Sequence, residues 1–481
     1  MVHALCGAGE VTTRREKEVK ERNNTLMHVI DFGLDTEAPP TIKEDITVMD
    51  PNNEAKLISR RTFLRGTLAL AGSAALASCA PAATEAPTEA PEPPAPEEVE
   101  ITIMYHGTSE DRRVKQVEAF NQHFPNIIVN VDEVPEDFPT KVFTLAAAGT
   151  LPDVVRVWEP HVLEFGRAGQ LRDLQPMIDA QPDFNPEDFY ESFYNFPVIA
   201  GKRFGIADDW NGHLAYYNKD LFDGTGLAYP TVDWTWDDLV SMAGQISNPD
   251  QGIWGTGMFF GWLHWNYKQI WQNGGQIYNE DYTKCLLDSP EAIEAMQFWA
   301  DLALEGEIMP GPAGEEPHVV FEAGKSGVLR NGSWEISALE QVEFAWELVS
   351  EPMQKERRTL LHTAFHVIPT TTENIDAAWK YLNFVVSTEG ILIVTRGASL
   401  IGARRSVNEE RPWVREGIDA DWDLVPQAAE YGILVPAPPN VGEVEKFQAD
   451  AFQAIYLGEK TAEEALTEVA PKVTEALTQE M

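Results

Sequence analysis

Length, composition and charge restrict what this chain can do. It has 481 residues, 43% of them hydrophobic, and a formal net charge of -41 at pH 7. So acidic a chain is excluded as a nucleic-acid binder, because phosphate backbones require a basic face.

The first segment with a recognisable pattern is 59–79. Arg60 and Arg61 precede an apolar run over 66–77 and small residues before Cys79. The run is too short to span a bilayer, which takes about 20 apolar residues. This order is typical of an export signal with a processing site. Residues 1–58 are charged and weakly periodic, and we interpret them as an extension from a start codon placed too early, with Met49 a candidate true start.

The same segment is similar to known bacterial signals. The stretch 59–65, Ser-Arg-Arg-Thr-Phe-Leu-Arg, resembles a twin-arginine signal, and 76–79, Leu-Ala-Ser-Cys, resembles a lipobox. The resemblance implies that Cys79 is acylated and becomes the new N-terminus, because several acyl chains anchor a protein durably. Residues 80–98 repeat Glu, Ala and Pro, which predicts an extended tether. The folded part should therefore stand on the outer face of the cytoplasmic membrane.

Strands and helices alternate at the start of the folded part. Periodicity predicts strands at 99–105, 127–131 and 153–158, and helices at 112–124 and 140–148, the second ended by Gly149. This order predicts a parallel, doubly wound α/β sheet. Ligands of such sheets gather where strands end, here near His106 and near Trp158-Glu159.

The alternation continues along the chain. We expect strands at 215–218, 319–321 and 327–329, and helices at 235–246, 290–304, 377–386 and 461–477. Ser289 should cap the helix at 290–304, and Pro471 should kink or break the last one. About 400 residues follow the signal, enough for two domains of ordinary size.

Cysteine and histidine usage gives no metal or disulfide signal. Of the three cysteines, only Cys285 falls in the part expected to fold, so no internal disulfide can form there. His362 and His366 are four residues apart, but they lie in a strand-like run, and no zinc spacing occurs. We therefore expect no metal and no cofactor.

A set of short motifs carries a family resemblance. The motifs, in order, are AAGTLPDV at 147–154, GQLRDL at 169–174, GKRFGI at 201–206, YNKDLF at 217–222, TWDDL at 235–239, NGG at 273–275, FEAGK at 321–325, NGSW at 331–334 and LNF at 382–384. Their order and spacing resemble the extracytoplasmic, sugar-binding solute receptors of ABC importers, the maltose-binding-like group. The resemblance covers 99–481.

This resemblance implies a type II two-lobed fold, each lobe a mainly parallel sheet flanked by helices, with the ligand in the cleft. By that pattern the first lobe comprises 99–209 and 366–400, the second 215–361 and 401–481, with hinges near 210–214 and 362–365. It also implies a monomer that is not an enzyme. The receptor would capture a mono- or oligosaccharide and deliver it to permease subunits of an ABC importer.

The chemistry of such a cleft selects candidate residues. Sugar hydroxyls pair with carboxylates and amides, and sugar C–H faces stack on aromatic rings. We expect tryptophans interleaved with polar side chains at loop positions near the cleft, and Trp334 matches a family position where a ring stacks on the sugar. The candidate ligand contacts are His106, Trp158, Glu159, Asp209, Trp210, Asn211, Trp262, Trp265, Trp334 and Glu335.

Two other classes of function stay open at this stage. The same fold could bind another solute, such as a glycerophosphodiester, a polyamine or a peptide; a phosphoryl ligand would need a cation such as Arg156 in the cleft. A secreted glycoside hydrolase would need two carboxylates at a fixed separation, and no marked pair stands out.

Overall fold

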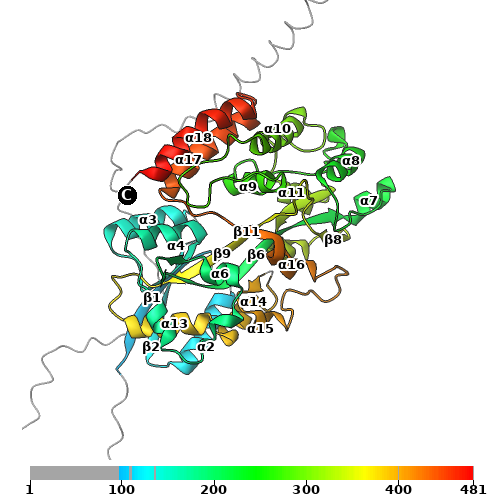
Figure 1. Ribbon diagram of the computed structural model, residues 1–481. Coiled ribbons are helices and arrows are strands. Elements are labelled where there is room, and N and C mark those ends of the chain that lie inside the picture. The colour runs from blue at the N-terminus through cyan, green and yellow to red at the C-terminus, as the bar shows by residue number, and fades with distance from the viewer. Residues whose placement is uncertain (1–96, 108–110, 135–136, 399, 480–481) are drawn as a thin grey trace, which may run out of the picture. The chain divides into compact units, whose positions relative to one another are not determined.

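The computed structural model describes residues 97–107, 111–134, 137–398 and 400–479 (Figure 1). The signal at 59–79, the anchor Cys79 and most of the tether lie outside these residues. The major elements are β1 (Val99–His106), α2 (Asp111–His123), β2 (Ile127–Val134), α3 (Phe138–Ala148), β3 (Val154–Trp158), α4 (Glu159–Arg167), β6 (Ile206–Asn218), α7 (Lys219–Thr225), α8 (Trp236–Ile246), α9 (Leu263–Gln272), α10 (Pro290–Glu305), α11 (Pro317–Glu322), β7 (Val328–Gly332), β8 (Trp346–Val349), β9 (Thr359–Val367), α13 (Ile375–Val385), α14 (Thr388–Thr395), α16 (Leu424–Tyr431), α17 (Val441–Tyr456) and α18 (Ala462–Thr478).

Shorter elements connect these. They are α5 (Gln175–Asp179), α6 (Glu191–Asn195), β4 (Val198–Ile199), β5 (Lys202–Arg203), α12 (Ile336–Leu339), β10 (Ile401–Gly402), α15 (Arg405–Asn408), β11 (Gly432–Leu434) and the 3-10 turns η1 (Pro186–Asp188), η2 (Pro249–Gln251) and η3 (Ser333–Glu335). Within the described ranges, we find no helix with the length and apolar character that a membrane crossing requires.

The first lobe is built as the alternating pattern predicts. β1 pairs in parallel with β2 on one side and with β3 on the other. Helix α2 packs on α13 and α14. Its Phe120 is fully buried and meets the rings of Tyr381 and Phe384 in α13. Helix α3 ends at Gly149, whose φ of 66° is the left-handed conformation that glycine adopts most readily. The carboxyl ends of β1 and β3 therefore lie side by side.

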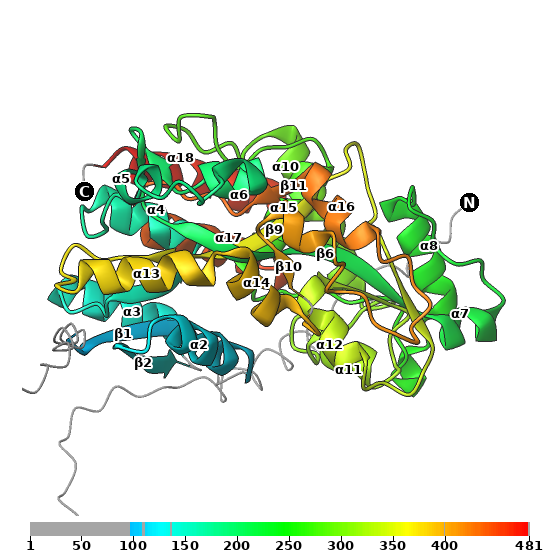
Figure 2. The same cartoon turned by 90° about the horizontal axis from the view of Figure 1, so that it is seen from below.

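Two long strands connect this lobe to the second. β6 and β9 pair antiparallel with each other; β9 also pairs antiparallel with β3, and β6 with β7 and β8. Figure 2 shows β6 running from the first lobe towards α7 of the second. β6 is far longer than the strand expected at 215–218. Almost all of its residues are buried, so the alternation that marks a half-exposed strand is missing from its first part.

The second lobe surrounds its own core. Helices α8, α9, α10, α17 and α18 gather around it, as Figure 1 shows. Ser289 caps α10 by accepting a hydrogen bond from the Ala292 N–H, as predicted. One expectation was wrong: residues 319–321 belong to helix α11, which Pro317 begins. The last helix is not broken at Pro471, because α18 continues through this residue.

The contacts of residues 401–408 bear on the predicted lobe boundary at 401. β10 pairs with β6 at Asp209 and Trp210, and Arg404 donates to the backbone carbonyls of Phe184 and Val386 in the first lobe. Beyond Asn408 the chain meets the second lobe, where Trp422 packs against Trp346. We therefore move this proposed lobe boundary to just after residue 408.

Candidate ligand-binding cleft

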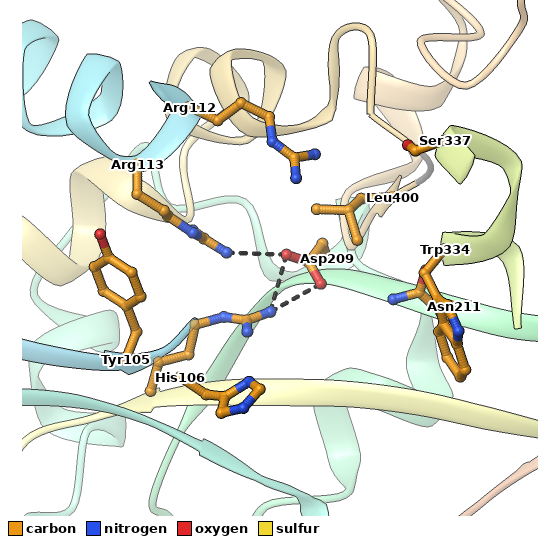
Figure 3. A pocket seen from close by; sticks show the side chains of 10 residues that line it. Tyr105, His106, Arg112, Arg113, Asp209, Asn211, Trp334, Ser337 and Leu400 are labelled. Atoms are coloured by element: carbon orange, nitrogen blue, oxygen red, sulfur yellow. Dashed lines mark hydrogen bonds and ion pairs between the residues drawn. The ribbon is translucent and has the colours of Figure 1, made fainter. Parts of the chain in front are cut away.

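A cavity of about 890 Å³, here called the large pocket, lies between the two lobes. Its walls come from α3, β3 and α4 of the first lobe, from the crossing strands β6 and β9, and from the start of α9, η3 and α17 of the second. A small pocket of about 280 Å³ adjoins it (Figure 3). Both share the lining residues His106, Arg156, Asp209, Asn211 and Trp334. The large pocket has the size usual for small-molecule sites.

The second lobe contributes two indole rings to this space. Trp262 immediately precedes α9, and Trp334 lies in η3, directly after β7. Their ring centroids are 5.8 Å apart, and the His362 ring of β9 stacks on Trp262 at 5.2 Å. Gly332 makes room for Trp334, because a Cβ at that position would lie 2.2 Å from the indole. All three rings are partly exposed.

The first lobe contributes a third indole ring. Trp158 ends β3, and its ring meets the edge of His106 at 5.2 Å and the ring of Phe138 at 5.7 Å. Burial, with the nearby charge of Arg156, lowers the pKa of His106, so that imidazole is neutral at pH 7. Aromatic faces from both lobes therefore line one cavity, which suits a ligand with flat apolar surfaces.

A buried ion network lies where the two pockets meet. Arg156 donates through Nη2 to both carboxylate oxygens of Asp209, at 2.8 and 2.9 Å, and through Nε to Asp208 at 3.2 Å. Arg113, from the first turn of α2, contacts both aspartates. Burial alone would raise the pKa of Asp208, but the two arginines hold it well below its usual value. These four side chains form the first-lobe network, and His366 lies 3.2 Å from Asp208.

Glu159 lies in the large pocket but is already engaged. It is 3% exposed, and its Oε1 accepts the backbone N–H of Thr363 in β9. His362 Nδ1 is 3.6 Å from the same oxygen. Glu159 thus ties the start of α4 to a crossing strand.

Seven of the ten predicted contacts line the two pockets: His106, Trp158, Glu159, Asp209, Asn211, Trp262 and Trp334. Trp210, Trp265 and Glu335 do not, and the prediction is corrected for them. Side chains alternate along a strand, so Trp210, between Asp209 and Asn211, points away from the cleft and stacks on Phe193 at 5.2 Å.

Trp265 and Glu335 are buried behind the pocket wall. Trp265 is fully buried on the inner side of α9, with Lys268 Nζ 3.7 Å from its ring centroid. Glu335 accepts a hydrogen bond from Asn331 Nδ2 at 2.6 Å, and burial raises its pKa to about 7. Both act in the packing beneath the aromatic surface.

Several lining residues escaped the sequence reasoning. Arg113, His161, His264 and Glu445 lie in or beside the pockets. Arg113 could have been found, because it opens the helix that follows β1. Glu445 could not, since α17 is far along the chain and carries no motif. Within the described ranges no cluster of three His, Cys, Asp or Glu side chains could hold a metal ion.

Comparison with known proteins agrees with this geometry. The sequence profile of the family described as bacterial extracellular solute-binding protein matches residues 107–391. An ABC substrate-binding protein from Listeria monocytogenes, solved in complex with cycloalternan, superposes with a TM-score of 0.75 at 25% identity, covering 80% of this chain and 100% of that one.

Two further relatives extend the comparison. The maltose-bound MalE3 of T. maritima has a TM-score of 0.67 at 24% identity, over 78% of this chain and 99% of its own, and it supports the fold alone. An arabinooligosaccharide-binding protein of Halalkalibacterium halodurans is 25% identical over 209 residues, which are 42% of this chain and 45% of that protein.

Proposed function

Since this chain belongs to the bacterial extracellular solute-binding protein family, we propose that it is a carbohydrate receptor of an ABC importer. It captures a mono- or oligosaccharide between its lobes and delivers it to permease subunits. The main observation is the cavity between the lobes, which is lined by Trp158 of the first lobe and by Trp262 and Trp334 of the second. Indole rings contributed by both lobes suit the apolar faces of a sugar ring.

Polar contacts would come from groups between these rings. Asn211 lines both pockets and offers an amide that can donate and accept, as a sugar hydroxyl requires. His106, neutral at pH 7, can do the same through its ring nitrogens. A ligand held by groups of both lobes favours the closed form, and binding then shifts the population towards closure.

Catalysis is not part of this proposal. Glycoside hydrolysis needs one carboxyl group as acid and another as nucleophile or base. Among the described residues, the large pocket is lined by three carboxylates. Glu159 accepts the Thr363 N–H, Asp209 pairs with two arginines, and Glu445 Oε1 lies 2.9 Å from His264 Nε2. Incubation with oligosaccharides should therefore give no shorter products, and product formation on chromatography would contradict this part.

A thermal-shift screen tests whether the protein binds a sugar. A ligand that binds only the folded state raises the melting temperature, so a set of mono- and oligosaccharides of increasing length should contain at least one that does. Calorimetry then gives the affinity for each hit. If no saccharide of any length shifts the transition, the carbohydrate proposal fails.

The cellular location of the receptor is a separate proposal. We infer that the segment 59–79 directs export, that Cys79 carries lipid, and that residues 80–98 tether a monomeric receptor to the outer face of the cytoplasmic membrane. Cys79→Ala should move the protein from the membrane fraction to the soluble fraction. Sedimentation of the variant with membranes would contradict the anchor.

A further inference from the structure

A third cavity, here called the side pocket, lies in the second lobe beside the cleft. It has a volume of about 300 Å³. Its walls come from the loop before α9, from the start of that helix and from the second half of α17, and they include Phe260, Leu263, Ala449, Phe452, Gln453 and Tyr456. The proposed function leaves this cavity unused.

The loop before α9 places the side pocket next to the large pocket. Phe260 and Gly261 line the side pocket, Trp262 lines the large pocket, and Leu263 lines both. Four consecutive residues therefore lead from one cavity to the other. The two cavities are neighbours, and Leu263 lies where they meet.

Helix α17, which packs on α9, gives the same result independently. Gly442 and Glu445 line the large pocket, and Ala449, Phe452 and Tyr456 line the side pocket. Successive positions in this series are three or four residues apart, so they share one face of the helix. At 1.5 Å per residue, Glu445 and Ala449 are about 6 Å apart along the helix axis. One face of α17 thus forms a wall of both cavities.

The chemistry of the side pocket suits a neutral sugar ring. Phe260 is partly exposed, and its ring packs edge-to-face with that of Tyr456 at 5.2 Å. Tyr456 is buried and donates its hydroxyl to Asn266, so this pair of rings is held in place. Gln453 is exposed and offers an amide that can donate and accept. None of the described residues that line this pocket is charged. A ring with an amide nearby matches the apolar face and the hydroxyl edge of a pyranose.

We propose that the side pocket extends the ligand-binding site and holds a further unit of an oligosaccharide whose other units lie in the large pocket. The saccharide passes between Leu263 and Ala449 and stacks on Phe260. The receptor therefore prefers oligosaccharides to short sugars, because only a longer chain fills both cavities. This assignment rests on the proposed carbohydrate function and specifies its substrate class.

Saccharides of increasing length test this on the full chain. Calorimetry with malto-, xylo-, manno- and arabino-oligosaccharides of two to six units gives the affinity for each length. In the series that binds best, the affinity for the hexasaccharide should exceed that for the disaccharide by at least about tenfold, the effect expected of one well-stacked ring. Equal affinities along every series would overturn the extension.

Two variants assign the gain in affinity to the side pocket. Phe260→Ala removes the stacking ring, and Ala449→Leu puts a larger side chain between the two cavities, at an exposed position of α17. Each should lower the hexasaccharide affinity about tenfold and leave the disaccharide affinity unchanged. Phe298→Ala on α10 and Ala454→Leu on α17, which line neither cavity, are the matched controls and should keep both affinities. Melting temperatures check that the variants fold, and Ala449→Leu still decides if Phe260→Ala does not.

The outcomes separate this assignment from the proposed function. A gain with length that both Phe260→Ala and Ala449→Leu keep would overturn the extension and leave the carbohydrate receptor standing. A concentration-dependent dimer in analytical ultracentrifugation that Phe260→Ala abolishes would also overturn it, because the side pocket would then be a contact between two copies of this chain. If no saccharide of any length binds, both proposals fail.

Discussion

Each lobe buries an ion network, and only the first of these two networks reaches the cleft. The first-lobe network joins Arg113 and Arg156 to Asp208 and Asp209. The second-lobe network, by which we mean Lys268, Arg330 and Glu351, joins two cations to one carboxylate. Arg156 of the first is partly exposed in the cleft, whereas all three side chains of the second are at most 1% exposed.

This difference suggests different roles for the two networks, one in ligand binding and one in stability. The first network places Arg113, Arg156 and Asp209 at the pocket wall, where a ligand can contact them. The second lies behind Trp265, whose ring centroid is 3.7 Å from Lys268 Nζ and 5.3 Å from the Arg330 guanidinium carbon. Burial lowers the pKa of Lys268 to about 7, although Glu351 opposes this. The second network should therefore affect stability more than ligand choice.

The largest expected effect is the loss of stability on removing Glu351, the one carboxylate of the second-lobe network. This variant tests whether the two networks differ in role. Glu351→Gln keeps the side-chain shape but leaves Lys268 and Arg330 buried without a counter-charge. Breaking a buried pair in this way costs about 3–5 kcal/mol in the free energy of unfolding. Urea unfolding measures it. Glu347→Gln, whose carboxylate is partly exposed and pairs with Lys219, is the control and should cost less than about 1 kcal/mol. Equal losses in the two variants would refute the contrast.

The next effect concerns affinity rather than stability. Trp334→Ala removes a ring that borders both pockets, and we expect binding of the best saccharide to weaken by about 1–3 kcal/mol, the usual value for a large apolar side chain. Calorimetry measures it. Trp379→Ala, on α13 and partly exposed outside the cleft, is the control and should bind normally. An unchanged affinity for Trp334→Ala would contradict the stacking role.

A subtler substitution moves the same ring without deleting it. In Gly332→Ala the new methyl group would lie 2.2 Å from the Trp334 indole, so the ring must shift. Overpacking of this kind costs about 1–3 kcal/mol, and we expect about 1 kcal/mol to appear as lost affinity. Gly261→Ala, with no atom within 4 Å of the new Cβ, serves as the control in calorimetry. Similar affinities for both glycine variants would show that ring position is unimportant.

The sequence predicted the fold better than the site. Periodicity located α2 and α3, whose buried residues recur at helical spacing, and β1, β2 and β3, whose apolar residues form short runs. It failed for most of β6, where burial on both faces removes the pattern, and for α11, where Val319 to Phe321 look strand-like although Pro317 starts a helix.

The candidate site was also predicted only in part. Trp158, at the end of β3, was predicted from topology, and Asp209, inside β6, was predicted from the crossing segment that the resemblance implies. Trp210 was misplaced because composition does not tell which face of a fully buried strand meets the cleft. The arginines of the small pocket were not assembled, since Arg113 and Arg156 come together only through β1, α2 and β3 packing side by side. Charges that are distant in sequence meet only through tertiary packing, so local spacing in the sequence does not predict their pairing.

The smallest expected effect on stability comes from Glu164, where the lobes meet between α4 and α17. Burial, aided by the charge of Glu445, raises the pKa of Glu164 from 4.5 to about 7, and its Oε2 has no partner among the described residues. The folded pKa exceeds the unfolded one, so the stability that this carboxyl contributes is complete below about pH 4.5 and is lost as pH rises through 7.

Glu164→Gln should therefore leave stability unchanged at pH 4.5 and raise it at pH 8 by roughly 1 kcal/mol, a value reduced for solvent screening because the group is partly exposed. Melting curves from pH 4.5 to 8 give the comparison, with Glu443→Gln, exposed on α17, as control. A gain of the same size at both pH values would mean that the glutamine improves packing and that Glu164 does not titrate between the lobes. A gain confined to high pH would place a titrating carboxyl at the lobe interface, apart from both ion networks, and lobe closure would then become easier as the pH falls.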